Sequence, residues 1–148
     1  MQESEITETA DETQQSHLLD MGCGRGRIAH YLATMTGGQV SGYNIDPNQL
    51  ENAVEWAAEC DMSDRLHFKT GDHHKPLQYD AGSFDGCFSI QAVWPFFKKD
   101  ELDAHAREMY RVLKTGARYS CSEYLLTPHF DWANEEHVAL HKLYLPTL

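Results

Sequence analysis

The 148-residue sequence predicts one α/β domain with a mostly parallel sheet of about five strands. Strand-like and helix-like apolar patterns alternate from His17 onward, which is typical of βαβ units. A glycine-rich turn, Asp20-Met-Gly22-Cys-Gly24-Arg-Gly26, directly follows the apolar pair Leu18-Leu19, as at the end of a first strand. The length suffices for a single core. Ligands are therefore expected at the carboxyl ends of the strands.

Glycine and proline separate the apolar segments and set the order of the elements. The expected strands, each a short apolar or alternating run, cover residues 17–21, 39–44, 66–69, 84–90 and 117–124. The expected helices, with apolar residues at helical spacing, cover residues 25–35, 48–60, 100–113 and 132–145. The breaks between these elements fall at Pro47, Gly71, Gly82 and Gly116.

The first 16 residues differ in composition from the rest of the chain. Residues 2–16 hold five acidic residues, no basic residue, and only Ile6 as a large apolar side chain. Such a segment buries too little apolar surface to offset the entropy of ordering it. We predict a disordered acidic tail over residues 1–16 and a folded domain over residues 17–148.

The formal net charge of −11 bears on the partners of the protein. Phosphate backbones and anionic membrane surfaces require basic patches, so no nucleic-acid partner is expected. No apolar run approaches the roughly 20 residues of a membrane span, and the N-terminus lacks the regions of a signal peptide. These features predict a soluble, cytoplasmic protein that does not span a membrane.

Cysteine and histidine patterns give no sign of a metal site. The four cysteines are scattered without a C-x-x-C pair, at positions Cys23, Cys60, Cys87 and Cys121. This spacing indicates neither a disulfide framework nor a zinc knuckle. His73 and His74 are adjacent, and His137 and His141 have helical spacing, but no H-E-x-x-H motif is present. We therefore expect no bound metal.

The spacing of the glycine turn distinguishes between cofactor classes. Gly22, Gly24 and Gly26 form G-x-G-x-G, and Arg27 stands where a dinucleotide-binding G-x-G-x-x-G turn has its last glycine. A plain strand-to-helix turn is the alternative to a cofactor loop. The D-x-G-x-G form resembles motif I of the class I S-adenosylmethionine-dependent methyltransferases. This resemblance implies a Rossmann-like sheet, S-adenosyl-L-methionine as the cofactor, and Asp20 close to its methionine part.

The ends of the next strands carry polar side chains suited to the rest of that cofactor. Asn44 lies where a side chain reaches ribose hydroxyls, although most methyltransferases of this class have an acid there. Asp46 is an alternative ribose ligand, or it caps the next helix. Asp72, after Gly71, is placed by the resemblance at the adenine amino group, with a plain turn residue as the alternative. The resemblance assigns eleven cofactor-binding residues: Asp20, Gly22, Cys23, Gly24, Gly26, Asn44, Ile45, Gln49, Asp72, His73 and Gln91.

A later segment resembles the sterol 24-C-methyltransferase family. The family pattern Y-E-W-x-x-T-x-x-F-D-x-x-N-x-x-H aligns in register with Glu123, Thr127, Phe130, Asp131, Asn134 and His137. The family also has an asparagine at position 44 and a glutamine at position 49. Its signature I-E-A-T-C-H-A-P aligns with residues 90–97, where Gln91 replaces the glutamate and the cysteine and histidine are absent. Segments 84–90 and 108–116 resemble the fourth strand and the following helix-to-strand junction of the class.

The sterol resemblance implies attack of a side-chain alkene on the sulfonium methyl group, which leaves a carbocation. Aromatic faces stabilise cations, and a carboxylate can accept the released proton. The aromatic candidates are Trp94, Phe96, Phe97 and Tyr124, with core packing as the alternative role. Glu123 and Asp131 are the catalytic candidates, Glu123 as the base or as the partner of a substrate hydroxyl, while Asp131 has helix capping as an alternative.

The resemblance also implies that sequence is missing from this domain. A full class I sheet has seven strands, two more than are expected here, and the sterol enzymes carry substrate-binding sequence before motif I. The chain is thus expected to be a fragment, a truncated gene product or a domain completed by a homodimer. The expected partner is a small lipid, a sterol first, and a sterol enzyme would act at the endoplasmic reticulum surface. Two alternatives stay open: another small lipid or metabolite as the acceptor, and a non-catalytic binding module.

Overall fold

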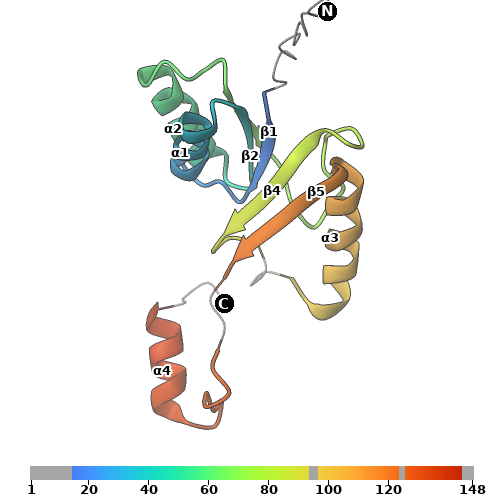
Figure 1. Cartoon of the computed structure of the whole chain (residues 1–148). Coiled ribbons are helices and arrows are strands. Elements are labelled where there is room, and N and C mark those ends of the chain that lie inside the picture. Colours follow the sequence, from blue (N-terminus) through green and yellow to red (C-terminus); the bar gives the residue numbers. More distant parts are fainter. Residues whose placement is uncertain (1–14, 94–96, 124–125, 145–148) are drawn as a thin grey trace, which may run out of the picture.

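The structure is a computed structural model that describes residues 15–93, 97–123 and 126–144. Its strands are β1 (His17–Met21), β2 (Gln39–Asn44), β3 (Leu66–Thr70), β4 (Phe84–Ile90) and β5 (Leu113–Ser122). Its helices are α1 (Arg27–Thr36), α2 (Pro47–Glu59), α3 (Lys99–Val112) and α4 (Glu135–Tyr144). The five strands form one parallel sheet, which confirms the predicted α/β class (Figure 1). The predicted acidic tail lies almost wholly outside the described residues.

The strand order β3-β2-β1-β4-β5 places β1 at the centre of the sheet. The chain runs outward from β1 through β2 to β3 and then crosses back to β4 on the other side of β1. Asp20, near the end of β1, is paired in register with Gly42 on one side and Phe88 on the other. A reversal of this kind opens a crevice at the carboxyl ends of the strands, where α/β proteins bind ligands.

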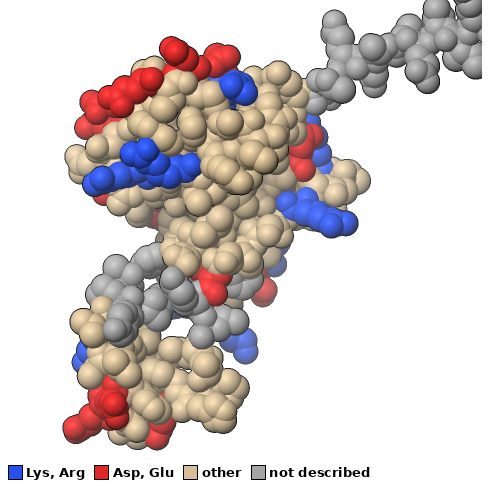
Figure 2. All heavy atoms as spheres, turned by 60° about the vertical axis from the view of Figure 1, so that its left-hand side comes forward, with Lys and Arg blue, Asp and Glu red and all other residues tan. Residues whose placement is uncertain are grey.

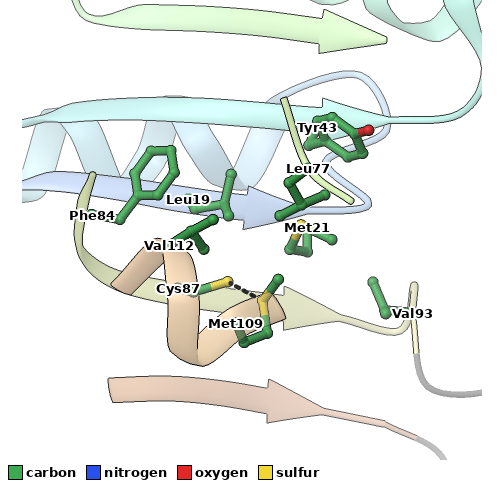
Figure 3. Close-up of a cluster of buried hydrophobic side chains, with 9 residues drawn as sticks. All are labelled: Leu19, Met21, Tyr43, Leu77, Phe84, Cys87, Val93, Met109 and Val112. Atoms are coloured by element: carbon green, nitrogen blue, oxygen red, sulfur yellow. Dashed lines mark hydrogen bonds between the residues drawn. The ribbon is translucent and has the colours of Figure 1, made fainter. Parts of the chain in front are cut away.

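Helices cover both faces of the sheet, and each interface has its own apolar core. Helices α1 and α2 lie on one face, where the buried residues are Ala29, Ala33, Val40, Ala57, Met62, Leu66 and Phe88. The opposite face packs against α3 and includes Leu19, Phe84, Met109 and Val112 (Figure 3). The two cores hold the sheet in a fixed position between the helices. Helix α4 stands apart from the sheet (Figure 1).

Most elements agree with the sequence prediction within one or two residues, but β5 and α4 begin elsewhere. The predicted strand over 117–124 begins instead at Leu113, directly after α3. Phe84 pairs with Leu113 and Gly86 with Arg118, so three extra residues of β5 bulge out around Gly116. Helix α4 begins at Glu135, because the Asn134 side chain accepts hydrogen bonds from the amides of residues 136 and 137.

A partly buried ion pair connects the long β3–β4 segment to α3. Arg111 donates to the carbonyl oxygens of Tyr79 at 2.8 Å and Leu77 at 3.0 Å, and its Nε donates to Glu108 at 2.9 Å. Glu108 in turn accepts from the amide of Leu77 at 2.6 Å. These hydrogen bonds and the guanidinium charge lower the pKa of the Glu108 carboxyl.

Replacing Arg111 with methionine is expected to lower the free energy of unfolding by about 2 to 4 kcal/mol, because two carbonyl groups and the Glu108 carboxylate lose the guanidinium that donates to them. Urea denaturation measures this change. Arg107→Met is the matched control, since Arg107 is an exposed residue of the same helix, and it should shift stability by no more than about 0.5 kcal/mol. Equal losses in the two variants would contradict the role given to Arg111.

Candidate functional site

The glycine turn after β1 is held close to two other segments. Gly22 has a φ of +76° and donates its amide to the Tyr43 carbonyl oxygen of β2 at 2.8 Å. A Cβ on Gly22 would lie 2.3 Å from the Cβ of Ala92, in the segment that follows β4. The left-handed backbone and this contact both require glycine. The turn is therefore packed between the ends of β2 and β4.

A polar group lies on the α2 side of the turn. Asn44, the buried last residue of β2, donates to the Gln49 side-chain oxygen at 3.3 Å. A Cβ on Gly24 would lie 3.3 Å from that same oxygen, so Gln49 also borders the glycine turn. Ile45, beside Asn44, exposes 56% of its surface. The structure thus brings Gly24, Asn44, Ile45 and Gln49 together at one edge of the sheet.

Asp46 has a structural role in this arrangement. Its Oδ1 accepts from the backbone amide of Asn48 at 2.9 Å, and its extended backbone is that of an N-cap residue for α2. Of the two roles that the sequence left open, the structure shows helix capping.

Asp20 is a buried carboxyl group at the end of β1. It exposes 3% of its surface, and its Oδ2 has no hydrogen-bond partner among the described residues. Burial raises the pKa of Asp20 to about 7. Burial, and then the Asp20 charge, raise the pKa of the Cys23 thiol, which keeps this cysteine protonated. An unpaired buried carboxylate is costly to stability, and such groups concentrate at functional sites.

Asp72 and His73 face different surroundings at the end of β3. Asp72 accepts from the His74 amide and from His74 Nδ1, both at 2.9 Å, and these bonds lower the pKa of the Asp72 carboxyl. The buried His73 side chain lines a cavity of about 270 Å³ together with Phe97 and His105. The residues lining this cavity include none of the Gly24, Asn44 and Gln49 group. The Asp72 carboxyl is therefore ionised at neutral pH. The lining of the cavity shows that the His73 ring lies toward α3.

The segment after β4 joins the end of β5 to the glycine turn. Gln91 has a φ of +53°, a conformation that non-glycine residues rarely adopt. The amides of Ala92 and Val93 donate to the same oxygen of Glu123, at 3.4 and 3.5 Å. Since Ala92 also contacts Gly22, Glu123 is connected to the turn through one residue. Neither Ala92 nor Val93 was assigned to the site from the sequence, and their only signal was their position after a buried strand.

Asp131 lies in a segment with hydrogen bonds of its own. Its Oδ1 accepts from the Ala133 amide at 2.8 Å, and its backbone amide donates to His137 Nδ1 at 3.0 Å. Within the described part of the chain, these partners of Asp131 all belong to residues 131–137. The structure therefore shows Asp131 closing the turn before α4, and it records no hydrogen bond between Asp131 and Glu123.

Comparison with known proteins shows the family to which this chain belongs. The family described as a methyltransferase domain matches residues 18–116, from β1 into the start of β5. The chain belongs to the class I S-adenosylmethionine-dependent methyltransferases. The cofactor of these methyltransferases is S-adenosylmethionine.

Three relatives show what the methyltransferase resembles. It is 32% identical over 120 residues to the sterol 24-C-methyltransferase ERG6 of Saccharomyces cerevisiae, covering 81% of this chain and 30% of that protein. Identity to the methyltransferase phqN of Penicillium fellutanum is also 32% over 120 residues, with 81% of this chain and 36% of that protein covered. The solved geranyl diphosphate C-methyltransferase of Streptomyces coelicolor A3(2) has the same fold, with a TM-score of 0.72 at 19% identity over 87% of this chain and 47% of that one. The methyltransferase thus spans about a third of the length of these curated relatives.

The described residues of the methyltransferase fit such a cofactor. The turn leaves no room for a Cβ at Gly22, the Asn44 amide is buried at the adjacent strand end, and Oδ2 of Asp20 has no partner among the described residues. These groups suit a ligand that presents hydroxyl groups and a cationic amine. The likeness to motif I and the geometry of the turn therefore agree.

The described residues also bear on membrane spanning, metal binding and surface charge. None of the described helices is long and apolar enough to cross a membrane. Over residues 15–93, 97–123 and 126–144, no three His, Cys, Asp or Glu side chains are grouped to hold a metal ion, and the four cysteines are free thiols. On the face drawn in Figure 2, basic side chains form separate small groups. Of the aromatic candidates, Trp94, Phe96 and Tyr124 lie outside the described residues.

Proposed function

We propose that this methyltransferase transfers a methyl group from S-adenosylmethionine to the side-chain alkene carbon of a sterol. The observation that carries the proposal is the link from Gly22 through Ala92 to Glu123, which joins a carboxylate to the cofactor turn. The 32% identity to a sterol 24-C-methyltransferase supports this choice of acceptor. The register of residues 123–137 with that family's segment supports it further.

The cofactor-binding roles in this proposal rest on the resemblance to motif I and on the strand ends near which these residues lie. Asp20 lies beside the amine of the methionine part, while Asn44 and Gln49 bind the ribose hydroxyls. Asp72 accepts from the adenine amino group, with Ile45 against the base. The remaining proposed cofactor contacts are Gly22, Cys23, Gly24, Gly26, His73 and Gln91. When bound, the cofactor supplies an electrophilic methyl group on a sulfonium sulfur.

The catalytic roles are assigned to carboxylates and an aromatic ring. After the alkene has taken up the methyl group, a proton must leave the resulting carbocation. Glu123 Oε2 is buried without a partner among the described residues, so this oxygen is proposed to accept the proton. Phe97 is the aromatic candidate that lies among the described residues, and its ring is proposed to stabilise the cation. Asp131, exposed before α4, is the second proposed carboxylate.

A second acceptor class has support of its own. The methyltransferase phqN, which is not named as a sterol enzyme, is as similar to this chain as ERG6, at 32% identity over 120 residues. Gln91 also stands where the sterol signature has a glutamate. The second candidate is therefore methylation of another small lipid or metabolite by the same cofactor site.

Methyl transfer to paired acceptors tests the proposal. The chain is incubated with methyl-labelled S-adenosylmethionine and a sterol that has a side-chain alkene, or with the same sterol saturated at that position. Mass spectrometry should find the label only in the alkene sterol. A chain that binds S-adenosylhomocysteine but labels neither sterol, while labelling a non-sterol lipid, would replace the sterol with the second candidate.

A further inference from the structure

The Glu123 carboxylate accepts backbone hydrogen bonds in addition to its proposed role as a proton acceptor. Its Oε1 accepts from two consecutive backbone amides, Ala92 at 3.4 Å and Val93 at 3.5 Å. Its Oε2 is buried and has no partner among the residues that the structure describes. The two oxygens therefore differ in their surroundings: one accepts from backbone amides, and the other is buried without a partner among the described residues.

The geometry of Gln91 explains why two successive amides point the same way. A left-handed residue beside a residue of ordinary backbone conformation turns consecutive N–H groups toward a common point, which suits an anion. Gln91 has a φ of +53°, and its own amide donates to the Ser122 carbonyl oxygen at 2.8 Å. Such strain persists only when neighbouring contacts hold it. Here those contacts are the β4–β5 ladder and the Glu123 carboxylate.

The segment held by Glu123 forms one wall of the glycine turn. The Ala92 Cβ lies 2.3 Å from the position that a Cβ would take on Gly22. Val93 is fully buried and belongs to the core cluster that also holds Met21 and Met109 (Figure 3). Val93 is thus held by packing as well as by its hydrogen bond to Glu123, whereas the amide of Ala92 donates to Glu123 alone among the described residues. Movement of Ala92 would open or block the Gly22 side of the turn.

We propose that Glu123 is a positioning residue, which uses its Oε1 to hold residues 91–93 against Gly22 and so keeps the cofactor turn in its binding shape. This inference rests on the proposed function in that S-adenosylmethionine is taken as the ligand of the turn. It adds a role separate from proton acceptance, because the two roles use different oxygens.

Two substitutions separate the roles. Glu123→Gln keeps an oxygen that accepts from the two amides but removes the basic carboxylate. It should leave the Kd for S-adenosylhomocysteine within about threefold of the original while turnover falls. Glu123→Ala removes both oxygens and should raise that Kd about tenfold or more. Glu136→Ala, at an exposed residue in the first turn of α4, is the control and should change neither quantity.

Amide hydrogen exchange tests the clamp without any ligand. In Glu123→Ala the amides of Ala92 and Val93 should exchange at least about tenfold faster, while the amides of β1 keep their protection. A Glu123→Ala variant with unchanged exchange at both amides would overturn the proposal. Unchanged S-adenosylhomocysteine affinity in that variant would do the same. If the original chain binds no S-adenosylhomocysteine, the proposed function fails, and the exchange rates still decide whether Glu123 holds the segment.

Discussion

Gly22→Ala is expected to abolish cofactor binding, with a Kd for S-adenosylhomocysteine raised at least about a hundredfold. The added Cβ would lie 2.3 Å from the Ala92 Cβ, so the turn and residues 91–93 must move apart. The φ of +76° adds strain for any residue with a side chain. Together these effects should lower the free energy of unfolding by about 2 to 4 kcal/mol. Calorimetric titration and urea denaturation measure the two changes.

Gly37→Ala is the matched control for this prediction. Gly37 ends α1 with a φ of +71°, nearly that of Gly22, but nothing lies within 4 Å of the Cβ it would receive. This variant should lose about 1 kcal/mol of stability from backbone strain alone and bind the ligand normally. Equal binding losses in the two variants would show that global destabilisation, rather than the Ala92 contact, is responsible.

Asp20→Asn is expected to stabilise the ligand-free chain at high pH while weakening ligand binding. Burial raises the pKa of Asp20 from 3.8 to about 7, so the folded chain binds a proton that the unfolded chain releases between these values. As the pH rises from about 4 to about 7, the ionisation of Asp20 therefore lowers the free energy of unfolding by up to about 4 kcal/mol. Asparagine removes the charge, so the variant should exceed the original chain by about 2 to 4 kcal/mol at pH 8. The advantage should vanish near pH 4.

The test for Asp20 is the difference in stability between variant and original at each pH. Burial also lowers the pKa of His105 to about 4. The effect of His105 on the free energy of unfolding therefore changes with pH in the opposite direction to that of Asp20. The stability that the neutral His105 ring contributes is fully present above about pH 6.5 and is lost as the pH falls toward 4. Because His105 is the same in both chains, it cancels in the difference. A difference that does not grow between pH 4 and pH 8 would contradict a buried Asp20 carboxyl with a raised pKa.

Asp20→Asn should at the same time raise the Kd for S-adenosylhomocysteine about tenfold, because the ligand's amine loses an ionised partner. A gain in stability together with a loss in affinity is the signature of a charge kept for binding. Unchanged affinity would remove Asp20 from the proposed site.

The sequence predicted the sheet well because its strands are separated by strong local signals. The strands 17–21, 39–44 and 84–90 were predicted with the bounds that the structure shows. The predicted start of β5 at residue 117 was wrong. The strand begins earlier because Leu113 pairs with Phe84 across a bulge, and no local sequence pattern encodes that pairing. The predicted start of α4 at Trp132 was three residues early, because the Asn134 side chain caps the helix.

The candidate site was predictable only where glycine or strand ends mark it. The turn from Gly22 to Gly26 and the strand-end position of Asn44 could be read from spacing. The direction of a side chain that follows a strand could not, because the alternation of the strand stops at its last residue. His73, next to Asp72, thus lies toward α3. The amides that hold Glu123 carry no sequence signal, since any residue supplies an N–H group.

Calorimetric titration of the chain with S-adenosylhomocysteine is the most direct test of the cofactor site, with Asn44→Ala and Asp72→Ala measured beside it. We expect micromolar binding by the original chain and at least about tenfold weaker binding by both variants, because each loses one polar group of the site. A folded chain that takes up no ligand, or that binds equally well in all three forms, would contradict a cofactor site at the carboxyl ends of β1, β2 and β3.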